Sequence, residues 1–137
     1  MTPKKTLKVL LDTNFLMIPI RFGVDIFSEM AGLLEVVVEP VVMQSVLDEI
    51  HLLLRDAKPS FSRELEFALK MASQCTVIDD ERRLQEKVDD SLIRIAVNSG
   101  FIVGTTDADL RRRLRAAGVP ALYLRQSNRL CIEGISP

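Results

Sequence analysis

Acidic residues follow two of the apolar, strand-like stretches in this chain, directly where each stretch ends. Asp12 comes after LKVLL, and Asp107, with Asp109 two residues later, comes after FIVGTT. Each acid has an ordinary explanation, because aspartate caps helices and forms turns. Two such acids in one small domain also have the placement to converge on one cleft, which is the second interpretation.

A helix-like stretch over residues 40–56, which opens with Pro40, offers a further acid. With a step of about 100° per residue, one face of this helix gathers the apolar residues Val42, Val46, Ile50 and Leu53. Glu49 lies at the flank of this face and Asp48 on the opposite side. We expect Asp48 at the surface and Glu49 at the edge of the core, where a carboxylate needs a partner. The alternative for Glu49 is a turn toward solvent or a pair with an arginine.

The helix-like stretch over residues 89–100 begins with two adjacent acids. Helical periodicity lets either Asp89 or Asp90 face a cleft at the start of this helix, so spacing does not choose between them. Acids in a first turn also favour the helix dipole without any further role. Asp79 and Asp80 follow another strand-like stretch and are interpreted as turn residues and surface charge.

Several carboxylates in one cleft cannot all stay ionised without a cation, since like charges raise one another's pKa. His51 is the only histidine and is expected at the surface, and the two cysteines, Cys75 and Cys131, show no ligand spacing. An all-oxygen site selects a hard ion such as Mg²⁺ or Mn²⁺. One or two such ions activate water for attack on a phosphodiester, with the acids as ligands. The residue types therefore predict metal-dependent phosphodiester hydrolysis.

Basic residues gather after Asp107, although the formal net charge of the chain is only −1. The cluster consists of Arg111, Arg112, Arg113 and Arg115, with Arg125 and Arg129 soon after. An ordinary solvated helix face would have the same composition. If the acids bind metal ions, these arginines would lie on the substrate side and hold phosphates.

The elements that must position these residues alternate along the chain. Strands are expected at residues 7–11, 35–39, 75–78, 101–106 and 119–124. Helices are expected at residues 25–34, 40–56, 62–73, 89–100 and 107–118. Near-continuous apolar strands joined by helices predict an α/β fold of three layers, α/β/α, with a central parallel sheet. Ligands of such sheets bind at the carboxyl ends of the strands, where Asp12 and Asp107 are placed.

Size and composition indicate one globular domain over residues 1–137, since hydrophobic residues make up 47% of the chain and charged residues 27%. No apolar run approaches the ~18 residues of a membrane span. The basic start MTPKKTLKVLLD resembles a signal peptide, but its apolar stretch is too short and ends in Asp12. We therefore expect a cytoplasmic protein without membrane association, with Cys75 and Cys131 reduced.

Four stretches of the sequence, taken together, resemble the PIN-domain family of metal-dependent ribonucleases. They are LLDTNFL, SVLDEI, VDDSLIRIA and GTTDADL, in the order in which the family places its acids. The resemblance spans Leu10 to about Leu124 and implies a PIN-like fold. The segment TTDADLRRRLRAAGVPALYLRQ is most similar to archaeal relatives of the PIN nucleases that process small-subunit ribosomal RNA precursors.

The resemblance also implies roles for individual residues. The catalytic and metal-binding acids would be Asp12, Glu49, Asp90 and Asp107. Asp90 is favoured over Asp89 because DSLI matches the family's Asp-Ala-Leu-Ile-like run. The auxiliary positions would be Asp89, Asp109, Asn14 and Thr105. The RNA contacts would come from Arg111, Arg112, Arg113, Arg115 and Arg125.

By this resemblance we expect a Mg²⁺- or Mn²⁺-dependent endoribonuclease that acts on an rRNA precursor, as a homodimer and together with ribosome-assembly factors. Two alternatives within the family are a toxin ribonuclease of a toxin–antitoxin pair and a PIN scaffold that binds RNA without cleaving it. A phospho-accepting receiver-like domain shares the α/β architecture but needs an acid pair after its first strand and a lysine after its last. Here Thr13 follows Asp12, and Arg125 follows the last expected strand.

Overall fold

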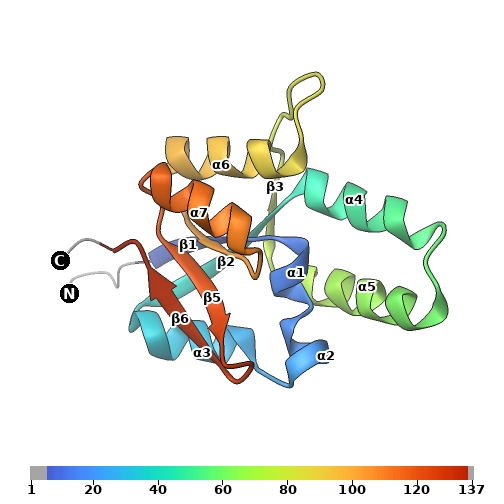
Figure 1. Cartoon of the computed structure of the whole chain (residues 1–137), viewed down its shortest axis with the longest axis horizontal. Coiled ribbons are helices and arrows are strands. Elements are labelled where there is room, and N and C mark those ends of the chain that lie inside the picture. The colour runs from blue at the N-terminus through green and yellow to red at the C-terminus, as the bar shows by residue number, and fades with distance from the viewer. Residues whose placement is uncertain (1–5, 136–137) are drawn as a thin grey trace.

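The sheet at the centre of the molecule has six strands in the order β3-β2-β1-β4-β5-β6 (Figure 1). This computed structural model describes residues 6–135. The strands are β1 (Thr6–Leu11), β2 (Val37–Met43), β3 (Thr76–Ile78), β4 (Ile102–Gly104), β5 (Ala121–Arg125) and β6 (Arg129–Glu133). Strands β1 to β5 are parallel, and β6 runs antiparallel to β5. The predicted parallel sheet is confirmed, but the sequence interpretation missed its antiparallel edge strand.

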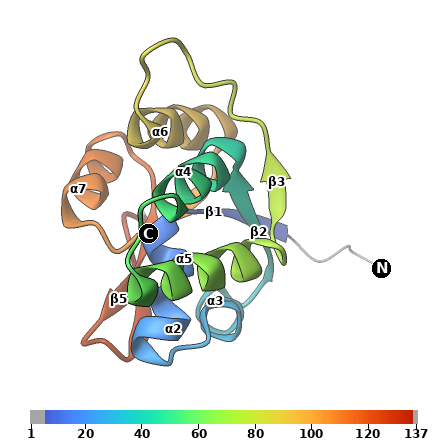
Figure 2. The same cartoon turned by 90° about the vertical axis from the view of Figure 1, so that its right-hand side faces the viewer.

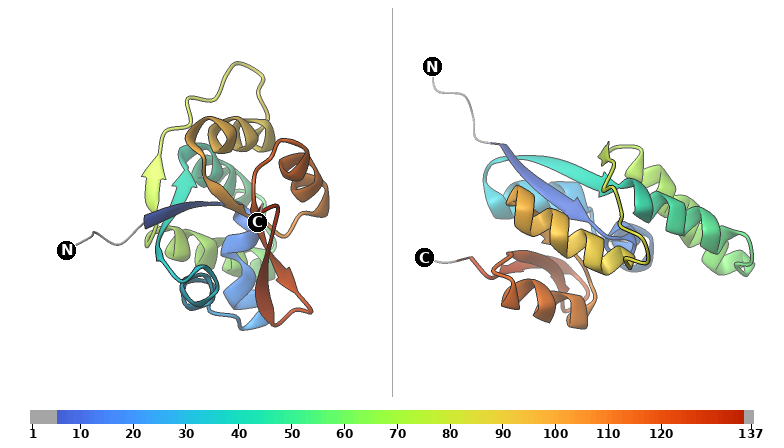
Figure 3. Two further views of the ribbon diagram at one scale, coloured as in Figure 1. Left: turned by 90° about the vertical axis from the view of Figure 1, so that its left-hand side faces the viewer. Right: turned by 90° about the horizontal axis from the view of Figure 1, so that it is seen from above.

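Helices cover both faces of this sheet. They are α1 (Thr13–Leu16), α2 (Ile18–Phe22), α3 (Ile26–Leu34), α4 (Gln44–Leu54), α5 (Pro59–Ala72), α6 (Val88–Ser99) and α7 (Ala108–Ala116). Helices α6 and α7 lie beside one another on one face, whereas α3 and α5 lie on the other (Figures 2 and 3). Helix α5 also packs against α1, α2 and α4. The predicted three-layer α/β/α architecture is therefore confirmed.

The strand order changes direction between β1 and β4, which is where α/β sheets bind their ligands. Leu11 is in register with Gly104, so the two strands end side by side. Gly104 permits this close packing, because a Cβ atom there would lie 3.0 Å from side-chain atoms of Leu11 and Phe15. The residues that follow β1 and β4 are thereby brought together, as the sequence predicted for Asp12 and Asp107.

The predicted start of the helix at Pro40 is wrong, because β2 continues to Met43 and α4 begins at Gln44. Pro40 is paired with Val9 of β1, whereas β3 pairs only with Val41–Met43. Pro40 therefore has a neighbouring strand on one side only, an edge-like position at which a strand tolerates proline. Val42, which sets the phase of the predicted helix, belongs to the strand.

Other boundaries also differ from the sequence prediction. Helices α1 and α2 are absent from the prediction, and α5 begins at Pro59 instead of residue 62 because proline is tolerated in a first helical turn. Strand β4 ends at Gly104 instead of residue 106, although the Thr105 N–H still donates to the Leu122 carbonyl oxygen of β5. Over the described residues, none of the helices combines the length and apolar character needed to cross a membrane. Both cysteines are free thiols.

Candidate active site

Asp12 lies at the end of the fully buried part of β1, and its carboxylate is held from two sides. The Asp12 side chain is only 8% exposed, and its Oδ1 accepts a hydrogen bond from the Phe15 N–H at 2.8 Å, which caps α1. The Asp12 N–H donates to the carbonyl oxygen of Gly104 at 3.1 Å. Asp12 is therefore a helix cap and also a carboxylate fixed at the switch point, so the two interpretations of the sequence are compatible.

Thr105 joins the ends of β1 and β4 through its buried hydroxyl group. Its Oγ1 donates to Asp12 Oδ2 and accepts from the Asp107 N–H at 3.0 Å. The Thr105 N–H donates to the carbonyl oxygen of Leu122 in β5 at 3.0 Å. Asp107 in turn caps α7, since its Oδ1 accepts from the Leu110 N–H at 3.0 Å. One threonine thus links the two acids that follow the strands.

Glu49 reaches the same region from α4. Its Oε1 accepts from Thr13 Oγ1 at 3.4 Å, directly beyond Asp12 in the chain. Glu49 is half-buried, next to the fully buried Ile50, as its predicted position at the edge of the core requires. Burial raises the pKa of Glu49, the hydrogen bond from Thr13 opposes this rise, and the charge of Asp89 adds to it.

The two adjacent acids at the start of α6 have different surroundings. Asp90 forms an ion pair with Arg113 at 2.5 Å. Burial raises the pKa of Asp89, and the charge of Asp107 raises it further. The charge of Asp89 also raises the pKa of Asp12. Asp89, an exposed residue, is therefore the α6 acid whose charge acts on Asp12 and Glu49 and whose own pKa is raised by Asp107, although the family motif favoured Asp90.

Asp12 has a strongly raised pKa. Burial raises it from 3.8 to about 7, against the hydrogen bonds from Thr105 and Phe15 that favour the ionised form. The charges of Asp89 and Asp107 also raise the pKa of Asp12. A buried carboxyl that is perturbed by neighbouring acids lacks a counter-charge, and a bound cation would supply one.

The donor set of Asp12, Glu49, Asp89 and Asp107 fits a hard divalent ion, because these side chains offer only oxygen atoms. Within residues 6–135, no three His, Cys, Asp or Glu side chains are already arranged as one ligand shell. Mg²⁺ keeps several of its waters and takes only one or two carboxylates directly, so acids at wider spacing can hold it through water. The residues present are therefore compatible with the metal that the sequence predicts.

The auxiliary residues predicted from the sequence differ in whether they contact the acids of the site. Thr105 contacts Asp12 directly, as described above. Asn14 is exposed in the first helical turn after Asp12. The Asp109 side chain is 79% exposed and forms an ion pair with Arg112 on the same helix. Of the predicted auxiliary positions, Thr105 and Asp89 are thus the ones that the structure couples to the acids.

The arginines of α7 divide between structural and exposed positions. Arg111 lies 4.2 Å from the centroid of the Tyr123 ring and 3.6 Å from Glu133, so it fastens α7 to β5 and β6. Arg113 faces the acids through its ion pair with Asp90. Exposed guanidinium groups also come from Arg112, Arg115 and Arg125.

The interpretation of Asp80 as a surface charge is wrong, because its side chain is only 2% exposed. It accepts hydrogen bonds from Ser45 of α4 and Ser91 of α6. Asp79 is exposed, as predicted. The sequence offered no signal for the burial of Asp80, since its two serine partners lie in other elements.

Thr105→Val is expected to weaken Mn²⁺ binding by roughly 10- to 100-fold, the usual effect of removing an outer-shell partner. Valine has a similar shape but cannot donate to Asp12, so it releases this carboxylate and raises its pKa further. Titration calorimetry with Mn²⁺ measures the effect. The matched control is Thr106→Val, because Thr106 is the exposed neighbour. Equal affinities for the two variants would contradict the role given to Thr105.

The raised pKa of Asp12 predicts that the metal-free protein loses stability as the pH rises from about 4 to about 7. In this window the folded state binds more protons than the unfolded state, so the free energy of unfolding falls with pH and levels off above about 7. The contribution is on the order of a few kcal/mol. Urea denaturation with chelator across this range should show a shallower decline for Asp12→Asn than for the wild type. The same slope of unfolding free energy against pH in both proteins would mean that the pH dependence comes from a group other than Asp12.

A family model described as a PIN like domain matches residues 9–127. This range covers most of the chain and contains the acids Asp12, Glu49, Asp89, Asp90 and Asp107. The chain therefore belongs to the PIN-like domain family, as the four sequence motifs predicted.

Similar proteins include two ribonucleases and one rRNA-processing protein. Ribonuclease VapC9 of Archaeoglobus fulgidus is 31% identical over 87 residues, which are 64% of this chain and 59% of that protein. An rRNA-processing protein FCF1 homolog of Mus musculus is 31% identical over 121 residues, which are 85% of this chain and 56% of that protein. The chain thus spans less than two thirds of each of these two relatives. Ribonuclease VapC4 of Methanocaldococcus jannaschii is 25% identical over 131 residues, with 93% of this chain and 98% of that protein covered.

A solved structure of the PIN domain endonuclease Utp24 has the same fold. It superposes with a TM-score of 0.76 at 20% sequence identity, over 93% of this chain and 92% of that chain. At this level of identity the likeness concerns the fold alone. It agrees with the three-layer α/β/α architecture described above.

Proposed function

We propose that this chain is a Mg²⁺- or Mn²⁺-dependent endoribonuclease. The observation that carries the proposal is the electrostatic coupling among acids from four places in the fold: Asp12 after β1, Glu49 on α4, Asp89 on α6 and Asp107 after β4. The pKa values of Asp12, Glu49 and Asp89 are raised, and charges within this group contribute to each rise. Membership of the PIN-like domain family supports a nuclease, and relatives named ribonucleases support RNA as the substrate.

In this proposal Asp12, Asp89 and Asp107 hold the ion, directly or through water. When bound, the ion would lower the pKa of an attacking water and neutralise charge on the leaving oxygen. Through its hydroxyl group, Thr105 keeps the Asp12 carboxylate in a fixed relation to the backbone of Asp107. Glu49 would take the proton of the attacking water as general base, and burial raises its pKa above the ordinary value.

We favour an rRNA precursor as the substrate. The likeness to the rRNA-processing FCF1 homolog includes 85% of this chain. Arg113, which pairs with Asp90, and the exposed Arg115 lie on the same helix and would hold phosphates of the RNA.

A toxin ribonuclease is the second candidate, and the match to VapC4 over 98% of that protein supports it. A toxin would arrest growth when it is expressed and would bind a small antitoxin. Unimpaired growth of a host that produces active protein would favour rRNA processing over this candidate.

Replacing Arg112, Arg113 and Arg115 by alanine is expected to weaken RNA binding and to reduce its salt dependence. The slope of log K against log salt concentration should fall by roughly one for each phosphate group that is no longer bound. Arg111 is left in place because it packs on Tyr123. Filter binding at several salt concentrations, with chelator present, gives the slope. The control is a variant with alanine at the exposed residues Arg55, Arg63 and Lys70 of the α4–α5 region. A slope unchanged from the wild type would mean that the α7 arginines do not contact RNA phosphates.

The proposed activity is tested by incubating the purified protein with a structured rRNA fragment in Mn²⁺, in Mg²⁺ and in chelator. We expect internal cleavage with either metal ion and none with chelator. A folded protein that leaves the RNA intact with both ions would instead support the non-catalytic scaffold. Cleavage that persists in chelator would exclude the metal-dependent mechanism.

A further inference from the structure

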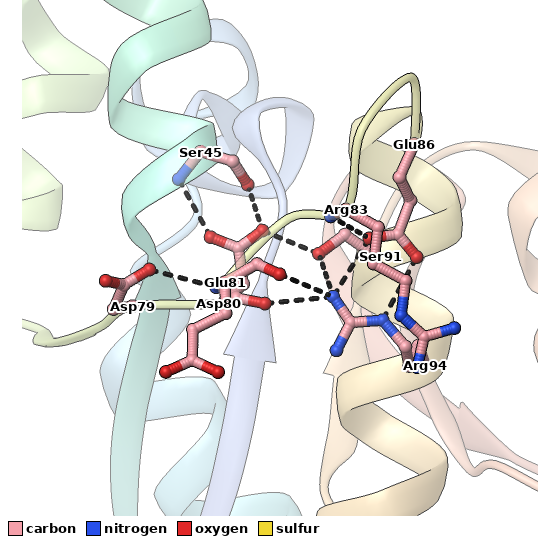
Figure 4. A network of polar contacts seen from close by, with 8 residues as sticks. All are labelled: Ser45, Asp79, Asp80, Glu81, Arg83, Glu86, Ser91 and Arg94. Carbon is pink, nitrogen blue, oxygen red and sulfur yellow. Dashed lines mark hydrogen bonds and ion pairs between the residues drawn. The ribbon is translucent and has the colours of Figure 1, made fainter.

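Asp80 is a buried carboxylate that the proposed reaction does not use (Figure 4). It follows β3, and both of its oxygen atoms are engaged. Oδ1 accepts from the Ser45 N–H at 3.2 Å, and Oδ2 accepts from Ser45 Oγ at 2.7 Å and from Ser91 Oγ at 2.6 Å. Burial by itself would raise the pKa of Asp80, but the hydrogen bonds from Ser91 and Ser45 outweigh it and leave the pKa lowered. Asp80 is therefore ionised at neutral pH.

At α4, Asp80 takes the place of a local helix cap. The N-cap residue Met43 makes no side-chain hydrogen bond to the helix. The first N–H groups of a helix have no partner within it, and Asp80 satisfies that of Ser45 with a negative charge that suits this end of the helix dipole. Glu49 lies four residues after Ser45, on the same face of α4. Asp80 thereby fixes the turn that leads to Glu49.

At α6, the N-cap residue likewise makes no side-chain hydrogen bond. The Ser91 hydroxyl, two residues after Asp89, donates to Asp80 instead. Arg94 secures the same loop, since its Nη2 donates to the Asp80 carbonyl oxygen at 2.9 Å and pairs with Glu86 at 2.9 Å (Figure 4). The loop before α6 is thus tied down at both of its ends.

We propose that Asp80 is a positioning residue that sets the placement of Glu49 relative to Asp89 by joining the starts of α4 and α6. This inference rests on the proposed metal-dependent function, because it assigns Asp80 to the support of that metal site. The reason is geometric: one carboxylate binds a serine of each helix, and each serine lies within four residues of an acid of the site.

A direct role as a metal ligand fits Asp80 less well. Its side chain is only 2% exposed, and its oxygen atoms already accept three hydrogen bonds. The substitution Asp80→Asn separates the two roles. The asparagine side chain would keep an oxygen for the Ser45 N–H, and its NH₂ group would donate to a serine hydroxyl, which also accepts hydrogen bonds. A positioning role therefore tolerates asparagine, whereas a ligand role that needs the negative charge does not.

The test compares wild type, Asp80→Ala, Asp80→Asn and the control Asp79→Asn, which removes the charge of the exposed neighbour but keeps the acceptor for the Glu81 N–H. For each, calorimetry measures the Mn²⁺ dissociation constant, and RNA cleavage at saturating Mn²⁺ gives kcat. We expect Asp80→Ala to bind Mn²⁺ roughly 10- to 100-fold more weakly and to lose kcat even when saturated. Asp80→Asn should recover most of both, and Asp79→Asn should resemble the wild type.

Normal Mn²⁺ affinity in folded Asp80→Ala would overturn the positioning role, and so would an asparagine variant as impaired as alanine. If Asp80→Ala does not fold, Ser45→Ala and Ser91→Ala each remove one hydrogen bond and decide the question. Weakened Mn²⁺ binding in both would support the proposal, and unchanged binding in either would refute it. A wild-type protein that binds no Mn²⁺ would overturn the proposed function together with this inference. Wild-type binding that Asp80→Ala leaves unchanged would overturn the inference alone.

Discussion

Asp12→Asn is expected to abolish metal-dependent RNA cleavage, with a loss greater than the roughly 10- to 100-fold typical of an outer-shell partner. Asp12 follows the buried end of β1, and its pKa is raised to about 7 by burial and by the charges of Asp89 and Asp107. A cation held there would replace the proton. Asparagine keeps the acceptor for the Phe15 N–H, so the cap of α1 and the fold should survive. The loss would therefore be one of chemistry and not of structure.

The measurement is the rate of cleavage of one RNA at saturating Mn²⁺, with circular dichroism as the check on folding. Asp48→Asn is the matched control, because Asp48 is an exposed acid of α4 whose side chain accepts a hydrogen bond from the surface residue Gln44. It should cleave at the wild-type rate. Cleavage by Asp12→Asn that equals the control would remove Asp12 from the reaction.

The second large effect distinguishes the two adjacent acids of α6. Asp89→Asn is expected to reduce cleavage by roughly 10²-fold or more, as does the removal of one electrostatic partner of a developing charge. Asp90→Asn should retain much of the activity, because Asp90 is paired with Arg113. This substitution would free the arginine and should alter RNA binding more than kcat.

This comparison uses two substitutions of the same chemistry on neighbouring residues, so each variant serves as the control for the other. The separate determination of kcat and KM shows which step is affected. A kcat that falls only in Asp90→Asn would restore the assignment suggested by the DSLI motif. Equal losses would mean that both acids take part.

Much of this site follows from the sequence because it depends on local rules. Apolar runs that end in Asp12 and Asp107 predict parallel strands with acids at their carboxyl ends, and the structure places the two ends side by side. Helical periodicity also predicts Glu49 at the edge of the core, although its phase depends on Val42, which lies in β2. Glu49 nevertheless lies at the edge of the core, because its neighbour Ile50 belongs to the buried face of α4.

The features that could not be predicted depend on partners from distant parts of the chain. Whether Asp89 or Asp90 faces the other acids is decided partly by Arg113, which lies 23 residues beyond Asp90. Asp80 looks like any loop acid until Ser45 and Ser91 are brought to it. Helical periodicity describes a single element, and these contacts arise only when elements pack together.

The misplaced start of α4 has a different cause. PVVM at residues 40–43 fits a helix that opens with proline as well as it fits a β-branched strand. Pairing of β2 with β1, from Thr6 opposite Val37 to Leu10 opposite Val41, decides in favour of the strand. This long-range pairing is absent from any local window of the sequence.

The central claim is that Asp12 after β1, Asp89 of α6 and Asp107 after β4 together hold a divalent metal ion, with Glu49 of α4 as the general base. Anomalous diffraction from crystals soaked in Mn²⁺ above pH 7 tests it most directly, because the signal reports the ion itself and the raised pKa of Asp12 favours binding at that pH. We predict one or two Mn²⁺ peaks within coordination or water-bridged distance of Asp12, Asp89 and Asp107, and no such peak in Asp12→Asn. Manganese bound only elsewhere on the protein, or bound equally in the variant, would contradict the account.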